Sequence, residues 1–380
     1  MPILNGVSTS IAMLTDELRE AGHSVALFAP KIPGHRDTDP NTYRFPSYTT
    51  VWSRGYPAAM PPYWPMLRHF RRHEFDLVHL HTPFFVGFTG LRWAESHGVP
   101  TVATYHTLYD RYAHYVPVFP RRYVRFRLAK HTNFFYNSVA HVVTPTETSE
   151  RWLRRHSIRT PISVIPTGIP RAQMIPRSLA REELGAPMTS RIMLYVGRLA
   201  REKNLETLLD AAALVFAHDE AARLWLVGDG PHRTALTQRV REMGIGDRVR
   251  FVGAVPRHEV DAYYAAADVF LFASITETQG LVLQEAMSYG LPAVAAAGGA
   301  ASEAIEHGID GFVAKNDPAD LALYLRLLLN DGELRMRFAE RAQRAVAGAT
   351  MAVMAERMLA VYRRVLEGTE DGRRLSPTLR

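Results

Sequence analysis

The segment 273–299, ASITETQGLVLQEAMSYGLPAVAAAGG, constrains the fold of this chain more than any other. It reads as the end of a buried strand, a polar loop, a short helix, a turn at Pro292 and a second strand. Apolar strands that alternate with helices in this way are typical of a sheet covered by helices. The segment therefore predicts an α/β fold.

Two glutamates stand eight positions apart in this segment, Glu277 in the loop and Glu285 inside the helix. Gly280 and Leu281 begin the helix, where backbone N–H groups carry partial positive charge and favour a phosphate. A carboxylate ahead of an anion site and another beside it would suit a sugar nucleotide, with hydroxyls at both ends and a diphosphate in the middle. The alternative is that Glu285 is a solvated helix residue and Glu277 an N-terminal capping acid.

The spacing of the two glutamates resembles the E-x7-E signature of family 4 glycosyltransferases with the GT-B fold. The longer string TETQGLVLQEAMSYGLPAVA resembles the branch that glycosylates diacylglycerol. The resemblance implies two facing Rossmann-like domains with an interdomain cleft, and a retaining transfer from a nucleotide sugar without a metal. It implies that Glu285 bonds the ribose hydroxyls and that Glu277 acts at the sugar.

The second half of the chain gives the clearer pattern. Strand-like runs end at glycines that face one predicted cleft, namely Gly197, Gly228 and Gly253. Arg198 and Lys203 flank the first of these turns, where two cations could hold a diphosphate and stabilise the leaving nucleotide. In the family's G-R-x-x-x-x-K pattern the matching residues do this, whereas isolated residues of these types are more often surface charges. The resemblance assigns Arg198, Lys203 and Glu277 as catalytic, together with His106 of the first half of the chain.

In the first half, the strand pattern 101–105 delivers His106 at its carboxyl end, where open α/β sheets bind ligands. His79 and His81 fit core histidines with satisfied hydrogen bonds. The loop that contains Asn5 and Gly6 precedes a helix and could take a phosphate, so we assign Gly6 to the donor and Asn5 to the acceptor. Family members begin with a strand ahead of this loop, and only four residues stand there. Either the start is misassigned and the strand is truncated, or the first domain lacks a central strand, which would be costly. We favour the first interpretation.

The motif YHTLYDRYAHY, residues 105–115, resembles the acceptor side of diacylglycerol glucosyltransferases, and implies that His106 lies near the reacting sugar. The helical segment after it interleaves arginines with aromatic residues, as an interfacial helix does. Arg122, Arg125 and Lys130 fall on one side of it, with Phe126 and Phe134 elsewhere. An ordinary helix with a solvated basic face is an equal alternative, and nucleic-acid binding has no further support. The predicted acceptor and membrane residues are Asn5, Tyr105, Tyr109, Asp110, Tyr112, Arg121, Arg122 and Arg125.

The positive charge is uneven. Residues 1–166 hold 19 Lys and Arg against 11 Asp and Glu, whereas residues 167–350 hold 20 against 23. The basic excess suits an anionic membrane surface. No apolar run approaches the 18 residues of a membrane span, no signal-peptide pattern is present, and there is no cysteine. These features predict a cytoplasmic protein at the inner face of the membrane, and no metal or cofactor is expected.

We predict that residues 1–166 with about 351–380 form an acceptor-binding, membrane-facing domain. Residues 167–350 form the nucleotide-sugar domain; 167–170 reads as a linker, and 170–190 is rich in proline and charge. Residues 31–50 are turn-rich, the runs 191–196 (RIMLYV) and 311–314 read as strands, 301–306 and 318–330 as helices, and 368–380 as a polar, frayed tail.

The predicted function is a retaining hexosyltransferase from a UDP-sugar to diacylglycerol or monoglycosyl-diacylglycerol. Three alternatives are a soluble sugar or sugar-phosphate acceptor, a UDP-sugar epimerase and a non-catalytic nucleotide-binding module. The sequence specifies neither the hexose nor the oligomeric state.

Overall fold

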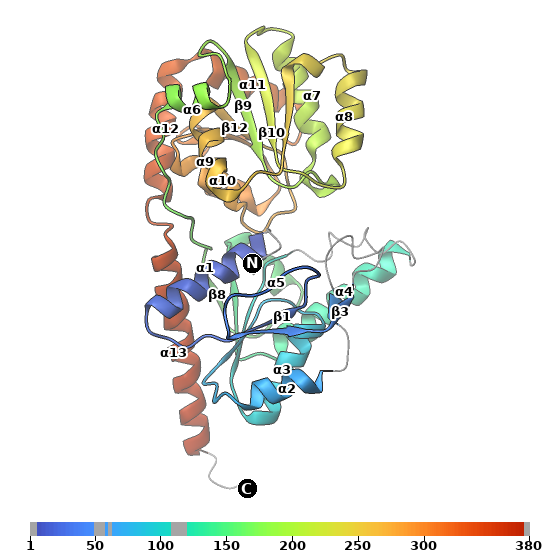
Figure 1. The fold of residues 1–380 in the computed structure, drawn as a ribbon, viewed down its shortest axis with the longest axis vertical. Coiled ribbons are helices and arrows are strands. Elements are labelled where there is room, and N and C mark those ends of the chain that lie inside the picture. The colour runs from blue at the N-terminus through green and yellow to red at the C-terminus, as the bar shows by residue number, and fades with distance from the viewer. Residues whose placement is uncertain (1–5, 49–57, 60–62, 108–119, 376–380) are drawn as a thin grey trace. The chain divides into compact units, whose positions relative to one another are not determined.

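The computed structural model describes residues 6–48, 58–59, 63–107 and 120–375, and the statements below concern these residues. The chain divides into two compact units (Figure 1). The first unit contains Met1–Gly168 and Met351–Arg380, and the second contains Ile169–Thr350. This division lies two residues after the predicted boundary.

A six-stranded parallel sheet forms the centre of the second unit, in the order β11-β10-β9-β12-β13-β14. This is the doubly wound order, in which the chain moves outward from β9 in one direction and then from β12 in the other. The strands are β9 (Arg191–Val196), β10 (Ala222–Val227), β11 (Val249–Gly253), β12 (Val269–Phe272), β13 (Ala293–Ala296) and β14 (Gly311–Ala314). The helices are α6 (Arg177–Glu183), η2 (Arg201–Lys203), α7 (Leu205–Phe216), α8 (Arg233–Glu242), η3 (Gly246–Arg248), α9 (Arg257–Ala266), α10 (Leu281–Ser288), η4 (Ala300–Ala304), α11 (Pro318–Asn330) and α12 (Gly332–Val346).

Helices bury both faces of this sheet (Figure 1). Successive side chains of a strand point to opposite faces. Met193 and Tyr195 of β9 therefore lie in one apolar core with α7, α8 and α11, whereas Ile192 and Leu194 lie in a second core with α9 and α10. A strand buried on both faces needs consecutive apolar residues, which is why the run RIMLYV predicted β9.

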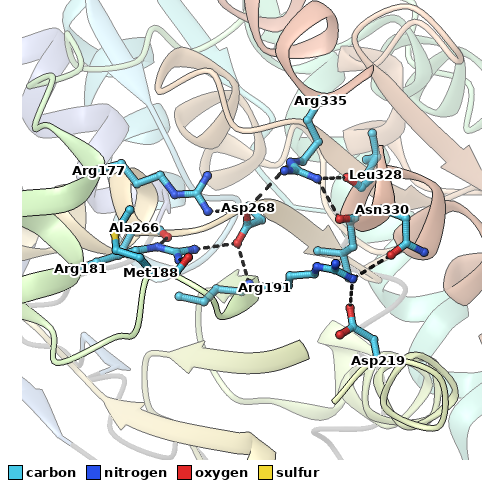
Figure 2. Close-up of polar contacts among 12 residues, drawn as sticks. Arg177, Arg181, Met188, Arg191, Asp219, Ala266, Asp268, Leu328, Asn330 and Arg335 are labelled. Atoms are coloured by element: carbon cyan, nitrogen blue, oxygen red, sulfur yellow. Dashed lines mark hydrogen bonds and ion pairs between the residues drawn. The ribbon is translucent and has the colours of Figure 1, made fainter. Parts of the chain in front are cut away.

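A buried ion-pair cluster ties the start of the second unit to this sheet (Figure 2). Arg181 of α6 is 0% exposed, and its Nη2 donates to Asp268 Oδ2 at 2.8 Å. Asp268 also accepts from the backbone N–H of Ile192 at 2.7 Å and pairs with Arg177. The rest of the Arg181 guanidinium donates to the carbonyls of Ala266, Pro187 and Met188. Residues 170–190 gave no helix prediction, so α6, which packs into the unit, was missed.

The larger sheet of the first unit has four parallel strands in chain order, β5 (Val78–Leu80), β6 (Thr101–Thr104), β7 (His141–Thr144) and β8 (Ile162–Val164). Two small sheets accompany it, the parallel pair β1 (Leu27–Pro30) and β2 (Thr42–Phe45) and the antiparallel pair β3 (Ser47–Tyr48) and β4 (Ala58–Ala59). Among the described residues, no strand joins the β1-β2 pair to the larger sheet.

Helices also cover both faces of the four-stranded sheet. Ala103 and Val142 pack in one core with α3, α4 and α5, and Val102 and Val143 pack in another with α1 and α13. The helices of this unit are α1 (Gly6–Glu20), α2 (Trp64–Arg71), α3 (Phe85–His97), α4 (Arg121–Asn137), α5 (Glu147–Arg155) and α13 (Met351–Leu375).

Other local predictions were also wrong. Helix α13 extends to Leu375, so the chain does not fray at residue 368; its apolar stripe ends at Val365, beyond which composition gave no signal. Residues 31–50 contain turns, as predicted, and also the short strands β2 and β3, which were not predicted. Residues 300–304 form a 3₁₀ turn where an α-helix was predicted.

Candidate active site

The loops after β9 and β12 form the candidate site of the second unit. The two strands are neighbours, and the strand order reverses between them. Loops diverge at the carboxyl ends of strands at such a switch point, which is where open α/β sheets bind ligands. Gly197, Arg198 and Lys203 follow β9, and Glu277 follows β12. Four of the predicted residues therefore belong to the two loops of one switch point.

Three predicted glycines allow the strand ends to approach closely. Gly228 N donates to Gly253 O at 2.7 Å, and a Cβ on Gly228 would lie 2.0 Å from Gly197 O. All three have positive φ angles, +150° at Gly197, +129° at Gly228 and +93° at Gly253, which L side chains rarely adopt. The edge of the sheet is thus lined by backbone, which suits close contact with a flat or anionic ligand.

An ion pair joins the two loops of the switch point. Lys203 Nζ contacts Glu277 Oε1, and the two side chains are 17% and 23% exposed. Burial lowers the pKa of Lys203 to about 8, and the charge of Glu202 opposes this shift. The loop after β12 is also fixed by the Ser274 and Thr276 hydroxyls, which donate to Glu202 O at 3.3 and 3.0 Å. Lys203 and Glu277, 74 positions apart in sequence, therefore form one charged centre.

Arg198 belongs to the same loop as Lys203. Its Nη2 donates to Glu202 Oε1 at 2.7 Å, and the Tyr195 hydroxyl donates to the Arg198 carbonyl oxygen at 3.2 Å. The Arg198 side chain is 33% exposed, so the guanidinium is anchored on one side and partly open to solvent.

Helix α10 begins at Leu281 with Gly280 as its N-cap, in the left-handed conformation at φ +75°. A Cβ on Gly280 would lie 2.6 Å from Ala301 Cβ, so the helix start is packed against η4. The N-cap residue is Gly280, so the interpretation of Glu277 as the capping acid was wrong. The backbone start of α10 keeps the geometry of an anion site.

Glu285 is buried, 8% exposed, so its interpretation as a solvated helix residue was wrong. It accepts from the Tyr264 hydroxyl at 3.0 Å and pairs with Arg257 at 3.3 Å. Burial raises the pKa of Glu285, and Arg257 and the Tyr264 hydrogen bond oppose that shift. The partners on α9 therefore hold the carboxylate in a fixed orientation.

In the first unit His106 lies just beyond β6, as the strand pattern predicted. Its Nε2 is 2.9 Å from His81 Nδ1. His79 bonds the Tyr362 hydroxyl at 2.6 Å and the Thr104 hydroxyl at 2.7 Å. Burial lowers the pKa of His106 to about 4, that of His79 to about 3 and that of His81 well below its usual value. These imidazoles are neutral at physiological pH.

The acceptor residues have mixed outcomes. Tyr105 is 0% exposed and packs between Tyr136 and Trp152, with ring centroids at 5.4 and 5.3 Å, so its assignment to acceptor or membrane contact was wrong. Gly6 is the first residue of α1. The predictions for Asn5, Tyr109, Asp110 and Tyr112 lie outside the described residues, as do the side chains of Arg121 and Arg125.

Helix α4 exposes aromatic and basic side chains together. Tyr123, Phe126 and Phe134 are 51%, 54% and 63% exposed, and Arg122 is also exposed. Lys130 Nζ lies 4.8 Å from the ring centroid of Phe126, so the predicted separation of these two residues was wrong. Within the described residues, no helix is both long and apolar enough to cross a bilayer.

The residues that hold the charged groups were missed by sequence reasoning. Glu202 in η2 bonds Arg198, and Arg257 in α9 pairs with Glu285. Each is a single charged residue outside any motif, so the sequence did not mark it as part of a site. Tyr264 reads as a core aromatic, and only its hydroxyl contact with Glu285 shows its polar role.

Two family profiles match most of the chain. The one described as "Glycosyltransferase Family 4" matches residues 4–173, and "Glycosyl transferases group 1" matches residues 176–345. The chain is 30% identical to the alpha-monoglucosyldiacylglycerol synthases of Acholeplasma laidlawii (83% of this chain and 83% of that protein) and Streptococcus pneumoniae (77% and 68%). It is also 30% identical to the GDP-mannose-dependent alpha-mannosyltransferase of Mycobacterium tuberculosis (96% and 94%).

Solved structures share the fold at lower sequence identity. Sucrose-phosphate synthase from Thermosynechococcus elongatus superposes with a TM-score of 0.79 at 23% identity, over 96% of this chain and 94% of that one. Anabaena HepE in complex with UDP-glucose gives 0.75 at 20% identity, over 96% and 97%. The chain therefore belongs to the family 4 glycosyltransferases and has their GT-B fold of two Rossmann-like domains.

Proposed function

We propose that this glycosyltransferase moves a hexose from a UDP-sugar to diacylglycerol or monoglycosyl-diacylglycerol, with retention of the anomeric configuration and without a metal. The observation that carries the proposal is the switch point of the second unit, where glycine turns, Lys203, Glu277 and the start of α10 converge. The UDP-sugar is a co-substrate, and no cofactor takes part.

In this proposal the second unit holds the donor. Glu285, fixed by Tyr264 and Arg257, bonds the ribose hydroxyls, and Glu277 bonds the sugar hydroxyls. Arg198, Lys203 and the backbone of Gly280 and Leu281 hold the diphosphate. Cations and N–H dipoles that are already oriented stabilise the charge on the departing nucleotide with little rearrangement.

The chemical step then needs little from an enzymic base. The glycosidic C–O bond to the diphosphate breaks, the acceptor oxygen bonds to the same face of the sugar, and a phosphate oxygen of the leaving UDP takes the acceptor proton. His106, as a neutral imidazole, is suited to hydrogen bonding with a sugar or acceptor hydroxyl.

A lipid acceptor is supported by three observations. Two relatives are named for monoglucosyldiacylglycerol synthesis. Helix α4 exposes three aromatic rings next to cationic side chains, and residues 1–166 carry the basic excess. Cations near anionic lipid head groups, with aromatic rings at the acyl boundary, favour peripheral binding. We propose that this surface binds the inner face of the cell membrane.

A soluble acceptor is the second candidate. One similar protein, from Corynebacterium efficiens, is named D-inositol 3-phosphate glycosyltransferase and is 30% identical over 318 residues. The lipid and the soluble acceptor would use the same donor unit and differ only in the acceptor. Because one relative is named for GDP-mannose, GDP-mannose is also tested as a donor.

A transfer assay tests the proposal. UDP-glucose, UDP-galactose, their N-acetyl analogues and GDP-mannose are each offered with diacylglycerol in anionic mixed micelles, with inositol phosphate, or with no acceptor. We expect a glycolipid with a UDP-hexose and a loss of at least about 100-fold in Glu277→Gln. Glu340→Gln, which alters a 70% exposed glutamate on α12, is the matched control and should retain wild-type rates.

The remaining outcomes separate the alternatives. If product forms only with inositol phosphate, the acceptor is soluble and the lipid proposal fails. Conversion of the sugar nucleotide without any acceptor would indicate an epimerase. Inversion at the anomeric carbon, measured by the proton coupling of the product, would refute retention. Loss of activity in excess EDTA would refute metal independence.

A further inference from the structure

Three histidines of the first unit, His79, His81 and His106, pack in a row. The ring centroids of His79 and His81 are 4.1 Å apart with the planes tilted by 32°, and those of His81 and His106 are 5.2 Å apart and stacked at 25°. Tyr362 of α13 bonds one end of the row through His79 Nδ1. The row therefore runs from a core helix to the residue that the proposed function places at the reacting sugar.

The contact of His81 Nδ1 with His106 Nε2, at 2.9 Å, couples the proton positions of the two rings. Two lone pairs or two N–H groups cannot face each other at this distance, so one nitrogen donates and the other accepts. In a neutral imidazole the proton sits on one nitrogen only. The proton in the contact thus decides whether His106 Nδ1 is a donor or an acceptor.

His79 limits the freedom of His81. Both nitrogens of His79 are engaged, by the Tyr362 and Thr104 hydroxyls, and its ring packs on that of His81. The orientation of His81 is therefore set from behind, and the orientation of His106 is set by His81. Buried histidines need a hydrogen-bond partner. His141 on β7 bonds the Ser163 hydroxyl, whereas the Nδ1 of His81 bonds His106.

We propose that His81 is a positioning residue for sugar transfer: its Nδ1 hydrogen bond fixes the ring orientation and tautomer of His106, and so selects whether His106 Nδ1 offers a proton or a lone pair to a substrate hydroxyl. This inference rests on the proposed function only in its last clause. The coupling between the two rings is a property of the first unit alone.

Two substitutions at His81 separate hydrogen bonding from packing. His81→Phe keeps a planar ring for the stack and removes Nδ1, whereas His81→Asn puts an amide close to the position of Nδ1 and removes the ring. His141→Phe is the matched control, because it removes a hydrogen-bonded strand histidine of the same sheet. The readouts are kcat and KM for the donor, and the ¹⁵N shifts of His106 in histidine-labelled protein, assigned by the loss of its signals in His106→Gln.

We expect kcat of His81→Phe to fall about 10- to 100-fold, with donor KM within about threefold of the wild type, because the defect lies in alignment and not in donor binding. His81→Asn should recover at least about tenfold of a 100-fold loss. In the wild type the two His106 nitrogens should show one protonated and one unprotonated shift, and in His81→Phe these shifts should move toward each other. His141→Phe should change neither readout.

Wild-type kcat in His81→Phe, or an unchanged His106 tautomer there, would overturn the proposal. An equal loss in His141→Phe would also overturn it, since any buried histidine would then matter. If the wild type transfers no sugar to any acceptor, the proposed function fails, and the ¹⁵N comparison still decides whether His81 sets the tautomer of His106.

Discussion

At the scale of single residues, the candidate donor site keeps its charges in pairs. Lys203 contacts Glu277, Arg198 bonds Glu202, and Arg257 pairs with Glu285. Lys203 is only 17% exposed, and a mostly buried cation without a counter-charge would be costly. Arg198 and Arg257 are 33% and 39% exposed, and their acids hold them in place at the edge of solvent. Binding of a diphosphate would therefore exchange partners instead of recruiting free cations. The sequence predicted Arg198, Lys203 and two of the acids, but it missed Arg257 and Glu202. It also missed the contact of Lys203 with Glu277, because contacts over 74 positions leave no local pattern.

The glycine turn at Gly228 gives the first prediction at this scale. Gly228→Ala should destabilise the second unit by about 2–4 kcal/mol, because a Cβ would lie 2.0 Å from Gly197 O at a positive φ. Gly246→Ala is the control, with nothing within 4 Å of its Cβ, and should stay within about 0.5 kcal/mol of the wild type. Urea unfolding followed by circular dichroism measures both, and equal stability of the two variants would contradict the packing argument.

The neutral histidines predict a pH dependence. Their pKa values in the folded state, about 3 for His79 and about 4 for His106, lie below the unfolded value near 6.5, so the unfolded chain binds more protons. Stability is therefore complete above about pH 6.5 and falls as the pH drops toward 4. The loss should be about 2 kcal/mol for each histidine at pH 5.

Unfolding of the first unit at pH 5 and pH 7.5 measures this loss. His79→Phe should show a smaller difference between the two pH values than the wild type. His258→Phe, which alters a 79% exposed histidine of the second unit, should keep the wild-type difference. A pH-independent wild type would refute the assignment of neutral buried imidazoles.

At the scale of elements, Asp268 joins parts of the second unit whose relative positions apolar packing alone would not fix. It lies between α9 and β12, accepts from the backbone N–H of Ile192 in β9, and pairs with Arg181 and Arg177 of α6 (Figure 2). Removal of one partner from a buried pair leaves the other charge without compensation. The cluster therefore specifies where α6 docks.

Asp268→Ala should destabilise the second unit by about 3–5 kcal/mol, because Arg181 stays buried without its carboxylate. Asp210→Ala is the control: its pair with Arg239 is 33–41% exposed and contributes at most about 1 kcal/mol. Chemical denaturation checks both variants. A loss below about 1 kcal/mol in Asp268→Ala would contradict the argument that buried Arg181 depends on this carboxylate.

Element positions followed from the sequence where periodicity was strong. β9, β14 and α11 begin and end where the apolar runs 191–196 and 311–314 and the helical pattern 318–330 predicted them. Helix α6 and buried Tyr105 escaped, because their environments are set by residues distant in sequence, Ala266 and Asp268 for α6 and the rings of α4 and α5 for Tyr105, which no local pattern encodes. Gly197, Gly228 and Gly253 lie at strand ends, which is why strand periodicity was enough to find them, whereas the two glutamates were found by their spacing.

At the scale of the whole molecule, the uneven charge predicts salt-dependent membrane binding. Arg122→Gln with Lys130→Gln should weaken binding to anionic vesicles about 10- to 30-fold at low salt, since each cation near such a surface contributes about 1 kcal/mol. Vesicle sedimentation at two salt concentrations measures it. Arg326→Gln with Arg344→Gln, both in the second unit, is the control pair and should bind as the wild type does. Equal weakening by both pairs would point to net charge instead of the α4 surface.

The order in which the two units can fold during synthesis follows from the position of α13. One core of the first unit joins Leu14 and Leu18 of α1 to Met358 and Val361 of α13, more than 330 positions later in the chain. The second unit, by contrast, is a single stretch from Ile169 to Thr350. As the chain leaves the ribosome, the second unit can therefore complete its core first. The apolar face of the first unit stays uncovered until α13 has been made. The part of the protein made first is the part that must be protected longest.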